Sequence, residues 1–322
     1  MITFDHISGN SKAAVTTGIL FNIQRFSIHD GPGIRTTLFF KGCPLRCFWC
    51  HNPEGLRPRP ELEFFPARCI GCGECVAACP HQAHLLQEGA HSLRREVCQV
   101  CGRCVEACYA GALELTGRRM TVDQVMGEVR RDRTFYESSE GGATLSGGEP
   151  LLQLDFARAI LEQCQAEGVH TAIETAAYCR WNDLAAVLPF TDLVLVDIKH
   201  LNPDKHRAVT GVSNRRILAN VRRLAQTGKP IIVRVPIVPG VNDTPEEIRD
   251  IAMFVRHLAE DHRVGGGADR LALELLTFHR LAADKYKSLG LDYAAGHLEA
   301  PAKEKMAELV SIAKACGIAV RS

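Results

Sequence analysis

The chain has 322 residues, of which 46% are hydrophobic and 23% charged, and its net charge is +1. This composition is typical of a globular protein with one or two domains, and the near-neutral charge indicates neither a nucleic-acid partner nor an anionic membrane surface. No apolar run reaches the ~20 residues that span a bilayer, and the first residues, MITFDHISGNSK, lack a secretory signal pattern. We therefore expect a cytoplasmic, monomeric protein that binds neither membrane nor nucleic acid.

Short apolar runs alternate with amphipathic segments along most of the chain. The runs are typical of buried parallel strands and occupy residues 19–24, 36–40, 143–145, 170–174, 192–197, 231–238 and 271–278. Helices are predicted at residues 121–132, 155–168, 244–260 and 301–317, with Thr121 as an N-cap and Pro245 at a first helical position, and the glycines at 265–267 predict a loop. This order predicts an α/β fold, a partial (β/α)6-type TIM barrel whose functional residues lie at the C-terminal ends of its strands.

Residues 55–115 break this order, because they contain many cysteines and only short elements. We predict that they form a small ferredoxin-like insert held together by metal, and that residues 1–54 and 116–322 form the barrel. The insert contains the runs CIGCGECVAAC and CQVCGRCVEAC, whose spacing is that of bacterial two-cluster ferredoxins, in which the fourth cysteine of each run binds the other cluster. The predicted ligand sets are therefore Cys69, Cys72, Cys75 and Cys108 for one 4Fe–4S cluster, and Cys79, Cys98, Cys101 and Cys104 for the other.

Two alternatives apply to the insert. Structural zinc usually takes paired C-x2-C hooks rather than triplets followed by a single cysteine, so the spacing favours iron–sulfur clusters. The clusters themselves can relay electrons, or they can serve only to hold the insert together.

The segment GCPLRCFWCHNPE contains Cys43, Cys47 and Cys50 with the spacing C-x3-C-x2-C. Three thiolates leave one iron of a four-iron cluster without a protein ligand, and an open iron is a Lewis-acid position. The insert cysteines satisfy two clusters among themselves, and the remaining three are scattered as small buried residues often are: Cys164, Cys179 and Cys316. We therefore expect the fourth ligand of this cluster to be a bound cosubstrate.

With this triplet, several other segments resemble the activating enzymes of glycyl radical enzymes, in the subgroup that carries a two-cluster insert. These segments are SIHDGPGIRTTLFFKGCPLRCFWCHNPEG, the two cysteine runs, GGATLSGGEPLLQ, DIKHLNPDKH and LLTFHRLAADKY. The resemblance implies an oxidoreductase with three 4Fe–4S clusters that cleaves S-adenosylmethionine (SAM) reductively. The resulting 5′-deoxyadenosyl radical would take an α-hydrogen from a backbone glycine of a partner glycyl radical enzyme, with ferredoxin or flavodoxin as electron donor.

The resemblance also implies a set of SAM contacts, most of them where a predicted strand ends, and no catalytic acid or base beyond the cofactor ligands. The contacts are Trp49, Cys50, His51, Gly147, Gly148, Glu174 (where the family often has Asp), Asp197, Ile198, Lys199, Arg234 and His279. Asp30 and Arg35, in the loop DGPGIR, are implied to meet the partner protein. Three alternatives stay open: DGPGIR as an ordinary turn, Trp49 as a core residue, and Arg234 in an internal salt bridge with Glu174 or Asp197.

Two other functions are compatible with part of the pattern. A radical SAM enzyme that acts on a small molecule or on another protein residue would share the triplet and the strand-end motifs. A plain electron carrier of the ferredoxin type would need only the insert, and neither SGGEP nor ~200 residues of barrel.

Overall fold

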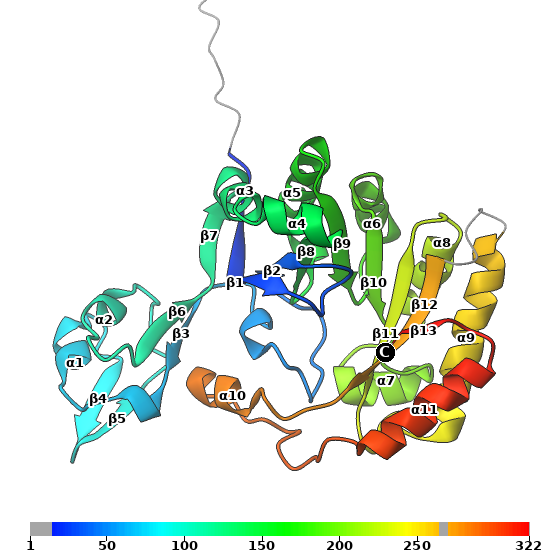
Figure 1. Ribbon diagram of the computed structural model, residues 1–322. Coiled ribbons are helices and arrows are strands. Elements are labelled where there is room, and N and C mark those ends of the chain that lie inside the picture. Colours follow the sequence, from blue (N-terminus) through cyan, green and yellow to red (C-terminus); the bar gives the residue numbers. More distant parts are fainter. Residues whose placement is uncertain (1–14, 264–269, 322) are drawn as a thin grey trace, which may run out of the picture.

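The computed structural model describes residues 15–263 and 270–321, so the predicted loop at 265–267 and the first twelve residues lie outside the described part. A nine-stranded sheet in the order β13-β12-β11-β10-β9-β8-β2-β1-β7 forms the centre of the molecule (Figure 1). Within the described ranges, no helix has the length and apolar character needed to cross a bilayer.

Six strands of the sheet are parallel and follow one another in chain order. They are β2 (Arg35–Phe40), β8 (Gly142–Gly147), β9 (His170–Thr175), β10 (Leu193–Asp197), β11 (Ile231–Ile237) and β12 (Leu271–Thr277), and the short β13 (Val320–Arg321) continues the series. Their apolar runs are buried almost throughout, as parallel strands covered on both faces require. No pairing joins β7 to β13 in the described chain, so the parallel strands form the open, partial barrel that the sequence predicts.

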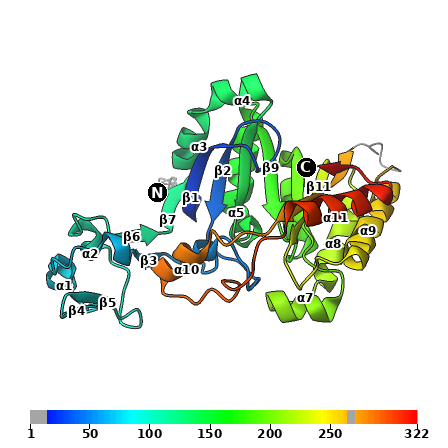
Figure 2. The same cartoon turned by 60° about the horizontal axis from the view of Figure 1, so that its bottom comes forward.

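Helices form an outer layer around the sheet (Figures 1 and 2). Within this layer α5 contacts α3 and α6, and α9 contacts α8 and α11. Thr121 caps α3 in a reciprocal capping box with Gln124, and Pro245 is the first residue of α9, as predicted. The helices are α3 (Val122–Arg130), α4 (Arg133–Ser139), α5 (Leu154–Ala166), α6 (Trp181–Val187), α7 (Pro203–Thr210), α8 (Arg215–Ala225), α9 (Pro245–Arg263), α10 (Ala283–Leu289) and α11 (Lys303–Ala315).

The prediction that residues 19–24 form a parallel strand is wrong. They belong to β1 (Thr17–Ser27), which pairs antiparallel with β2 on one side and with β7 (Arg118–Thr121) on the other. Burial alternates along β1, which is typical of an antiparallel strand with one face toward solvent. The barrel therefore begins with an antiparallel edge, and its parallel part begins at β2.

The insert is attached through an antiparallel pair, β3 (Glu61–Phe64) and β6 (Leu113–Thr116), and projects from one side of the barrel (Figures 1 and 2). Its other elements are α1 (Glu74–Ala78), the hairpin β4 (His84–Gln87) and β5 (Ala90–Leu93), and α2 (Arg103–Glu106). Its hydrophobic cluster is small, with Leu62, Cys104 and Leu113 as the buried members. A core of this size is consistent with an insert that depends on metal.

Helix α10 joins the insert to the barrel. The Ser288 hydroxyl donates to Glu63 Oε1 (2.8 Å), and the Arg95 guanidinium donates to the carbonyls of Leu62 (2.5 Å) and Ser288 (2.6 Å). At its other end Lys285 pairs with Glu54 (2.9 Å), in the turn η1 (Pro53–Gly55) that follows the cysteine triplet. One short helix thus contacts both cysteine-bearing regions.

Candidate functional site: a cysteine-lined cavity at the strand ends

The loop after β2 places the three thiols at the C-terminal edge of the parallel strands, where they line a cavity of about 200 Å³. The lining also includes residues at the ends of β8, β9, β10, β11 and β12. Its members named in the sequence analysis are Cys43, Cys47, Trp49, Cys50, His51, Gly147, Gly148, Glu174, Asp197 and Lys199, and the others are Leu45, Asn52, Ser146, Thr175, Ala176, Pro236 and Leu276. Residues from six separate parts of the sequence therefore meet at one site.

Three glycines allow the segments beside this cavity to touch backbone to backbone. The amide of Gly42 donates to the carbonyl of Gly55 (2.8 Å), and the amide of Gly148 donates to the carbonyl of Phe40 (2.8 Å). A Cβ on Gly148 would lie 2.1 Å from Gly42 O and 2.6 Å from Gly55 O. The glycines of SGGEP therefore have a structural role in addition to any contact with a ligand.

Glu174 stands in a buried network of charges. It pairs with Arg234 Nη1 (2.8 Å) and accepts a hydrogen bond from the Ser146 hydroxyl. Burial alone would raise the pKa of Glu174, but the charge of Arg234 and the bond from Ser146 outweigh it and hold the pKa below its ordinary value. Glu174 is therefore an anion within the cavity wall.

Arg234 uses every guanidinium nitrogen on protein acceptors, which corresponds to the internal salt bridge considered above. Besides Glu174, it pairs with Glu274 through Nε (2.7 Å) and donates from Nη2 to the carbonyl of His29. The side chain is buried on β11 and does not line the cavity. Its position is suited to fixing Glu174 and the loop after β1.

Asp197 and Lys199 form an ion pair of 2.9 Å at the end of β10. Burial would lower the pKa of Lys199, but the charge of Asp197 and the hydrogen bond to it outweigh burial and raise the pKa, so the ammonium remains protonated beside the thiols. Ile198, between them, is buried in the main core and does not line the cavity, so it can contribute only backbone.

His51 and His279 stack on each other, with ring centroids 4.0 Å apart. His51 lines the cavity, whereas His279 is exposed and reaches the site only through His51. Burial, followed by the neighbouring His279, lowers the pKa of His51 to about 4. Trp49 packs with Val238 and Phe278 and also lines the cavity, so it is both a core residue and part of the wall.

Arg35 is fully buried, so its position does not suit the direct partner contact expected for it. Its guanidinium donates to Thr144 Oγ1 (2.6 Å) and to the carbonyls of Ala143 (2.7 Å) and Pro32 (3.1 Å), and it therefore supports the DGPGIR loop from beneath. Asp30, partly exposed in that loop, accepts from Ser27 Oγ (2.5 Å) and Thr37 Oγ1 (2.7 Å).

Glu149, the carboxylate of SGGEP, is a further residue of the site that the sequence motifs alone do not single out. Its carboxylate is almost fully buried and accepts from Thr175 Oγ1 (2.8 Å) and from the amides of Ala176 (3.0 Å) and Leu151 (3.3 Å). It therefore ties the loop after β8 to the loop after β9. The signal available in the sequence was a carboxylate directly after two glycines at a strand end.

The donor set at the cavity fits a cluster with one open iron, because three thiols converge there and a fourth is absent from the lining. Cys164 lies beside Met126 Sδ (3.7 Å), Cys179 beside Asn220 (3.9 Å) and Cys316 beside the carbonyl of Ile312 (3.4 Å). Among the described residues, none of these three lines the cavity.

The insert groups its eight cysteines in the two predicted sets. One small pocket is lined by Cys69, Cys72, Cys75 and Cys108, and a second by Cys79, Cys98, Cys101 and Cys104. Each pocket draws its last thiol from the other run, as the ferredoxin pattern requires. Each thiol set has the four donors that one 4Fe–4S cluster needs.

Two histidines of the β4–β5 hairpin stand between these pockets. His84 Nδ1 lies 2.9 Å from His91 Nε2, which is 3.5 Å from Cys75 Sγ. Burial lowers the pKa of both rings, that of His84 to about 4, so both are neutral near pH 7.

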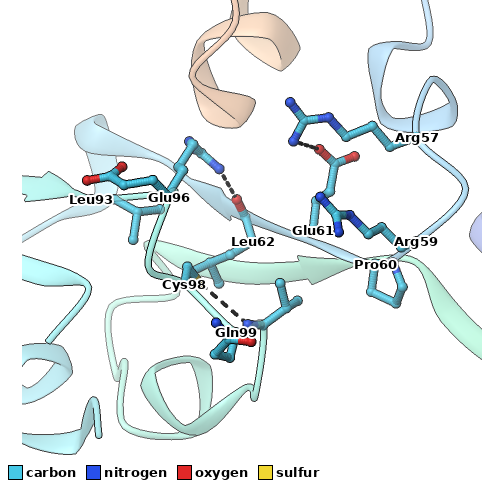
Figure 3. A pocket seen from close by; sticks show the side chains of 11 residues that line it. Arg57, Arg59, Pro60, Glu61, Leu62, Leu93, Glu96, Cys98 and Gln99 are labelled. Carbon is cyan, nitrogen blue, oxygen red and sulfur yellow. Dashed lines mark hydrogen bonds and ion pairs between the residues drawn. The ribbon is translucent and has the colours of Figure 1, made fainter. Parts of the chain in front are cut away.

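A larger cavity, of about 700 Å³, opens where the insert meets the barrel (Figure 3). Arg57 and Arg59 stand on one side, Arg57 paired with Glu61 (3.1 Å), and Glu96 and Leu93 on the other. Cys98, from the second thiol set, also lines it. This cavity gives solvent a route to the edge of that set.

Comparison with known proteins finds two families along the chain, and their matched ranges overlap at residues 102–109. Residues 102–255 match the Radical SAM superfamily, and residues 62–109 match a 4Fe-4S dicluster domain. The fold and the cysteine-lined site thus define a radical SAM protein with an iron–sulfur insert.

The relatives narrow this class to one family. The chain is 44% identical to the (2S)-3-sulfopropanediol dehydratase activating enzyme of Klebsiella oxytoca, over 86% of this chain and 86% of that protein. It is 40% identical to the benzylsuccinate synthase activating enzyme of Thauera aromatica, over 94% of this chain and 91% of that protein. A solved domain of a pyruvate-formate lyase-activating enzyme from Bacteroides vulgatus is 28% identical, with a TM-score of 0.45, over 56% of this chain and 98% of that one. The chain belongs to the radical SAM activating enzymes of glycyl radical enzymes.

Proposed function

We propose that this protein binds SAM and three 4Fe–4S clusters and uses them to generate a radical on a backbone glycine of a partner glycyl radical enzyme. The observation that carries this proposal is the cavity at the strand ends, where three thiols without a fourth meet the residues expected to contact SAM. When bound, the cluster and SAM together supply the one-electron chemistry that yields a carbon radical.

The residues of this chain bind and orient the site cluster and SAM. Cys43, Cys47 and Cys50 hold the site cluster, and the ion pair of Asp197 with Lys199 provides opposite charges for the charged end of SAM. Glu174, held in place by Ser146 and Arg234, supplies an anion for a hydroxyl or ammonium group. The apolar side chains of Leu45, Trp49 and Leu276 in the same wall reduce the access of water.

The loop that leads into β2 is the proposed meeting point with the partner protein. Ile28 is exposed there, and the carbonyl of His29 is bound by Arg234, so the loop is fastened directly to the site network. Asp30 shapes the loop through Ser27 and Thr37. A glycine-bearing segment that rests on this loop would lie next to the cavity.

The insert is the proposed electron entry, with ferredoxin or flavodoxin as donor in the cytoplasm. Two sets of four thiols provide two cluster sites, and α10 connects the insert to the turn after Cys50. Arg57 and Arg59 give the cavity of Figure 3 a basic side, which favours an acidic carrier protein.

The first experiment is anaerobic reconstitution with iron and sulfide, followed by reduction and addition of SAM. We expect 5′-deoxyadenosine as a product. The Cys47→Ala variant should form none, yet keep about eight irons per chain in the two insert sites. A fully loaded parent protein that yields no 5′-deoxyadenosine would contradict the proposal.

A second experiment separates this function from action on a small molecule. The reduced protein is incubated with SAM and a purified glycyl radical enzyme, and electron paramagnetic resonance is recorded. A glycyl radical signal is expected with the parent protein and not with Cys47→Ala. Cleavage of SAM without this signal would favour the alternative substrate class.

A further inference from the structure

We propose that His84 and His91 form a hydrogen-bonded bridge between the two cluster sites of the insert and raise the reduction potentials of both clusters. This inference rests on the proposed function only in that both thiol sets hold clusters. The two histidines are positioning residues, because they act through hydrogen bonds to the cluster ligands and sulfides rather than as ligands themselves.

The bridge has one histidine in the wall of each pocket. His91 lines the pocket of Cys69, Cys72, Cys75 and Cys108, and His84 lines the pocket of Cys79, Cys98, Cys101 and Cys104. The two rings stack with centroids 5.1 Å apart and are joined by the contact of 2.9 Å between His84 Nδ1 and His91 Nε2. The same His91 nitrogen lies 3.5 Å from Cys75 Sγ. A continuous chain of polar contacts therefore runs from one thiol set to the other pocket.

The atoms that His84 and His91 contact determine which ring nitrogen of each histidine carries the proton. A ligating thiolate only accepts hydrogen bonds, so Cys75 requires the proton on His91 Nε2. That single N–H is shared between Cys75 Sγ and His84 Nδ1 as a bifurcated hydrogen bond, so Nδ1 must be the bare nitrogen of the His84 ring. His84 therefore carries its own proton on Nε2.

That Nε2 atom is what points to a ligand in the second pocket. It is buried without a hydrogen-bond partner among the described residues, and the whole His84 side chain is 2% exposed. A buried N–H without an acceptor is costly, and a pocket lined by four thiols would supply sulfur acceptors once its cluster is bound. The opposite proton arrangement would leave Cys75 without this donor and the second pocket without an N–H.

Hydrogen bonds to cluster sulfurs stabilise the more negative, reduced state and so raise the reduction potential. His91 acts on the first cluster through Cys75, and His84 acts on the second. Because the bond between the rings fixes which nitrogen of His84 is protonated, a change at His91 reaches both clusters.

The test uses the full chain with Cys47→Ala, in which the insert clusters are the only ones expected. Redox titration followed by electron paramagnetic resonance measures the potential of each. His91→Phe should lower the potentials of both clusters, and His84→Phe should lower chiefly that of the second. Ser92→Ala, on the opposite face of the same strand as His91, is the matched control and should leave both potentials unchanged.

Potentials of both clusters that remain equal to those of Ser92→Ala in the two Phe variants would overturn the proposal. If a Phe variant loses its iron, electron–nuclear double resonance on the unsubstituted hairpin decides instead. With isotopically labelled histidine, nitrogen coupling is expected at the first reduced cluster, where His91 is the histidine of the lining. Absence of that coupling would refute the bridge. Neither readout requires SAM cleavage, so failure here and failure of the proposed function are separate results.

Discussion

Gly148 has no room for a side chain, because its Cα lies against the backbones of Gly42 and Gly55. In Gly148→Ala the new Cβ would meet two carbonyl oxygens at 2.1 and 2.6 Å, and neither belongs to a flexible side chain. We expect a loss of roughly 1–3 kcal/mol in stability, together with poorer loading of the triplet with iron. Thermal denaturation and iron analysis measure both effects.

Gly127→Ala is the matched control. Gly127 lies on the exposed face of α3, where a Cβ would meet no described atom within 4 Å. That substitution should stabilise the helix by up to about 1 kcal/mol. Equal melting temperatures for the two variants would show that the glycine contact is unimportant.

Glu149 should make stability depend on pH. Burial raises its pKa from 4.5 to about 7, against the opposing hydrogen bond from Thr175. Because the folded pKa lies above the unfolded one, the stabilisation is complete below about pH 4.5 and is lost as the pH rises through about 7. Glu149→Gln should remove this dependence. The melting temperature of the variant minus that of the parent should therefore increase from pH 5 to pH 8.

The exposed Glu162 offers a control for this pH series, since Glu162→Gln changes the same charge on the surface of α5. Parallel pH curves for the parent and Glu149→Gln would contradict the prediction.

At this scale the sequence identified the thiols and most of the cavity lining, because cysteine spacing and strand-end motifs depend on short segments. Arg35 was expected to contact the partner protein and is buried, and whether Arg234 binds a ligand was left open. Both arginines are satisfied by acceptors distant in the sequence, such as Thr144 for Arg35 and Glu274 for Arg234. A charged residue inside an apolar strand predicts a buried polar partner, but the local sequence does not identify that partner.

Among the elements, α10 contacts both the insert and the turn that follows the cysteine triplet. Arg95→Ala would remove two hydrogen bonds that join β3 to α10. Hydrogen exchange should become faster in β3 and α10 and stay unchanged in β8 and β9, because the central strands do not depend on this contact.

Arg94→Ala is the neighbouring control, because Arg94 donates to the carbonyl of Gln82 within the insert. It should leave the exchange of α10 as in the parent. If Arg94→Ala and Arg95→Ala gave the same exchange pattern, the proposed joint at α10 would be wrong.

The strands were predicted best where an apolar run was long, as in β9 to β12, and the helices where a cap or an N-terminal proline marked the start, as in α3 and α9. The prediction for β1 was wrong because an apolar run is compatible with either strand direction. Only the alternation of burial along Thr17–Ser27 distinguishes β1 from the parallel strands. Helix α10 has only seven residues, too few for its periodicity to be recognised.

At the scale of the whole molecule, the insert should be removable. Phe64 and Leu113 are register partners in the β3–β6 pair, so an Asn-Gly turn placed between them would close a hairpin in place of residues 65–112. We expect the shortened protein to keep about four irons and to cleave SAM with dithionite as reductant, but to lose cleavage driven by ferredoxin or flavodoxin.

The bond from Ser288 to Glu63 is retained in this design, which keeps the hairpin attached to α10. Equal rates with dithionite and with the carrier protein in the shortened chain would show that the insert has a structural role only. Failure of the triplet to take up iron would show that the two parts of the molecule depend on each other for assembly.

The β3–β6 pair also bears on the order in which a newly made chain assembles. Every cysteine from Cys69 to Cys108 leaves the ribosome before β8, the parallel neighbour of β2. The chain between β2 and β8 forms a loop that must close before these strands can pair. Because Glu61 and Thr116 are paired, a folded insert shortens the flexible part of this loop to roughly half. Halving a flexible loop reduces its closure cost by about 0.6 kcal/mol. Iron delivered early to the insert would thus favour the first parallel pairing of the barrel by roughly a factor of three.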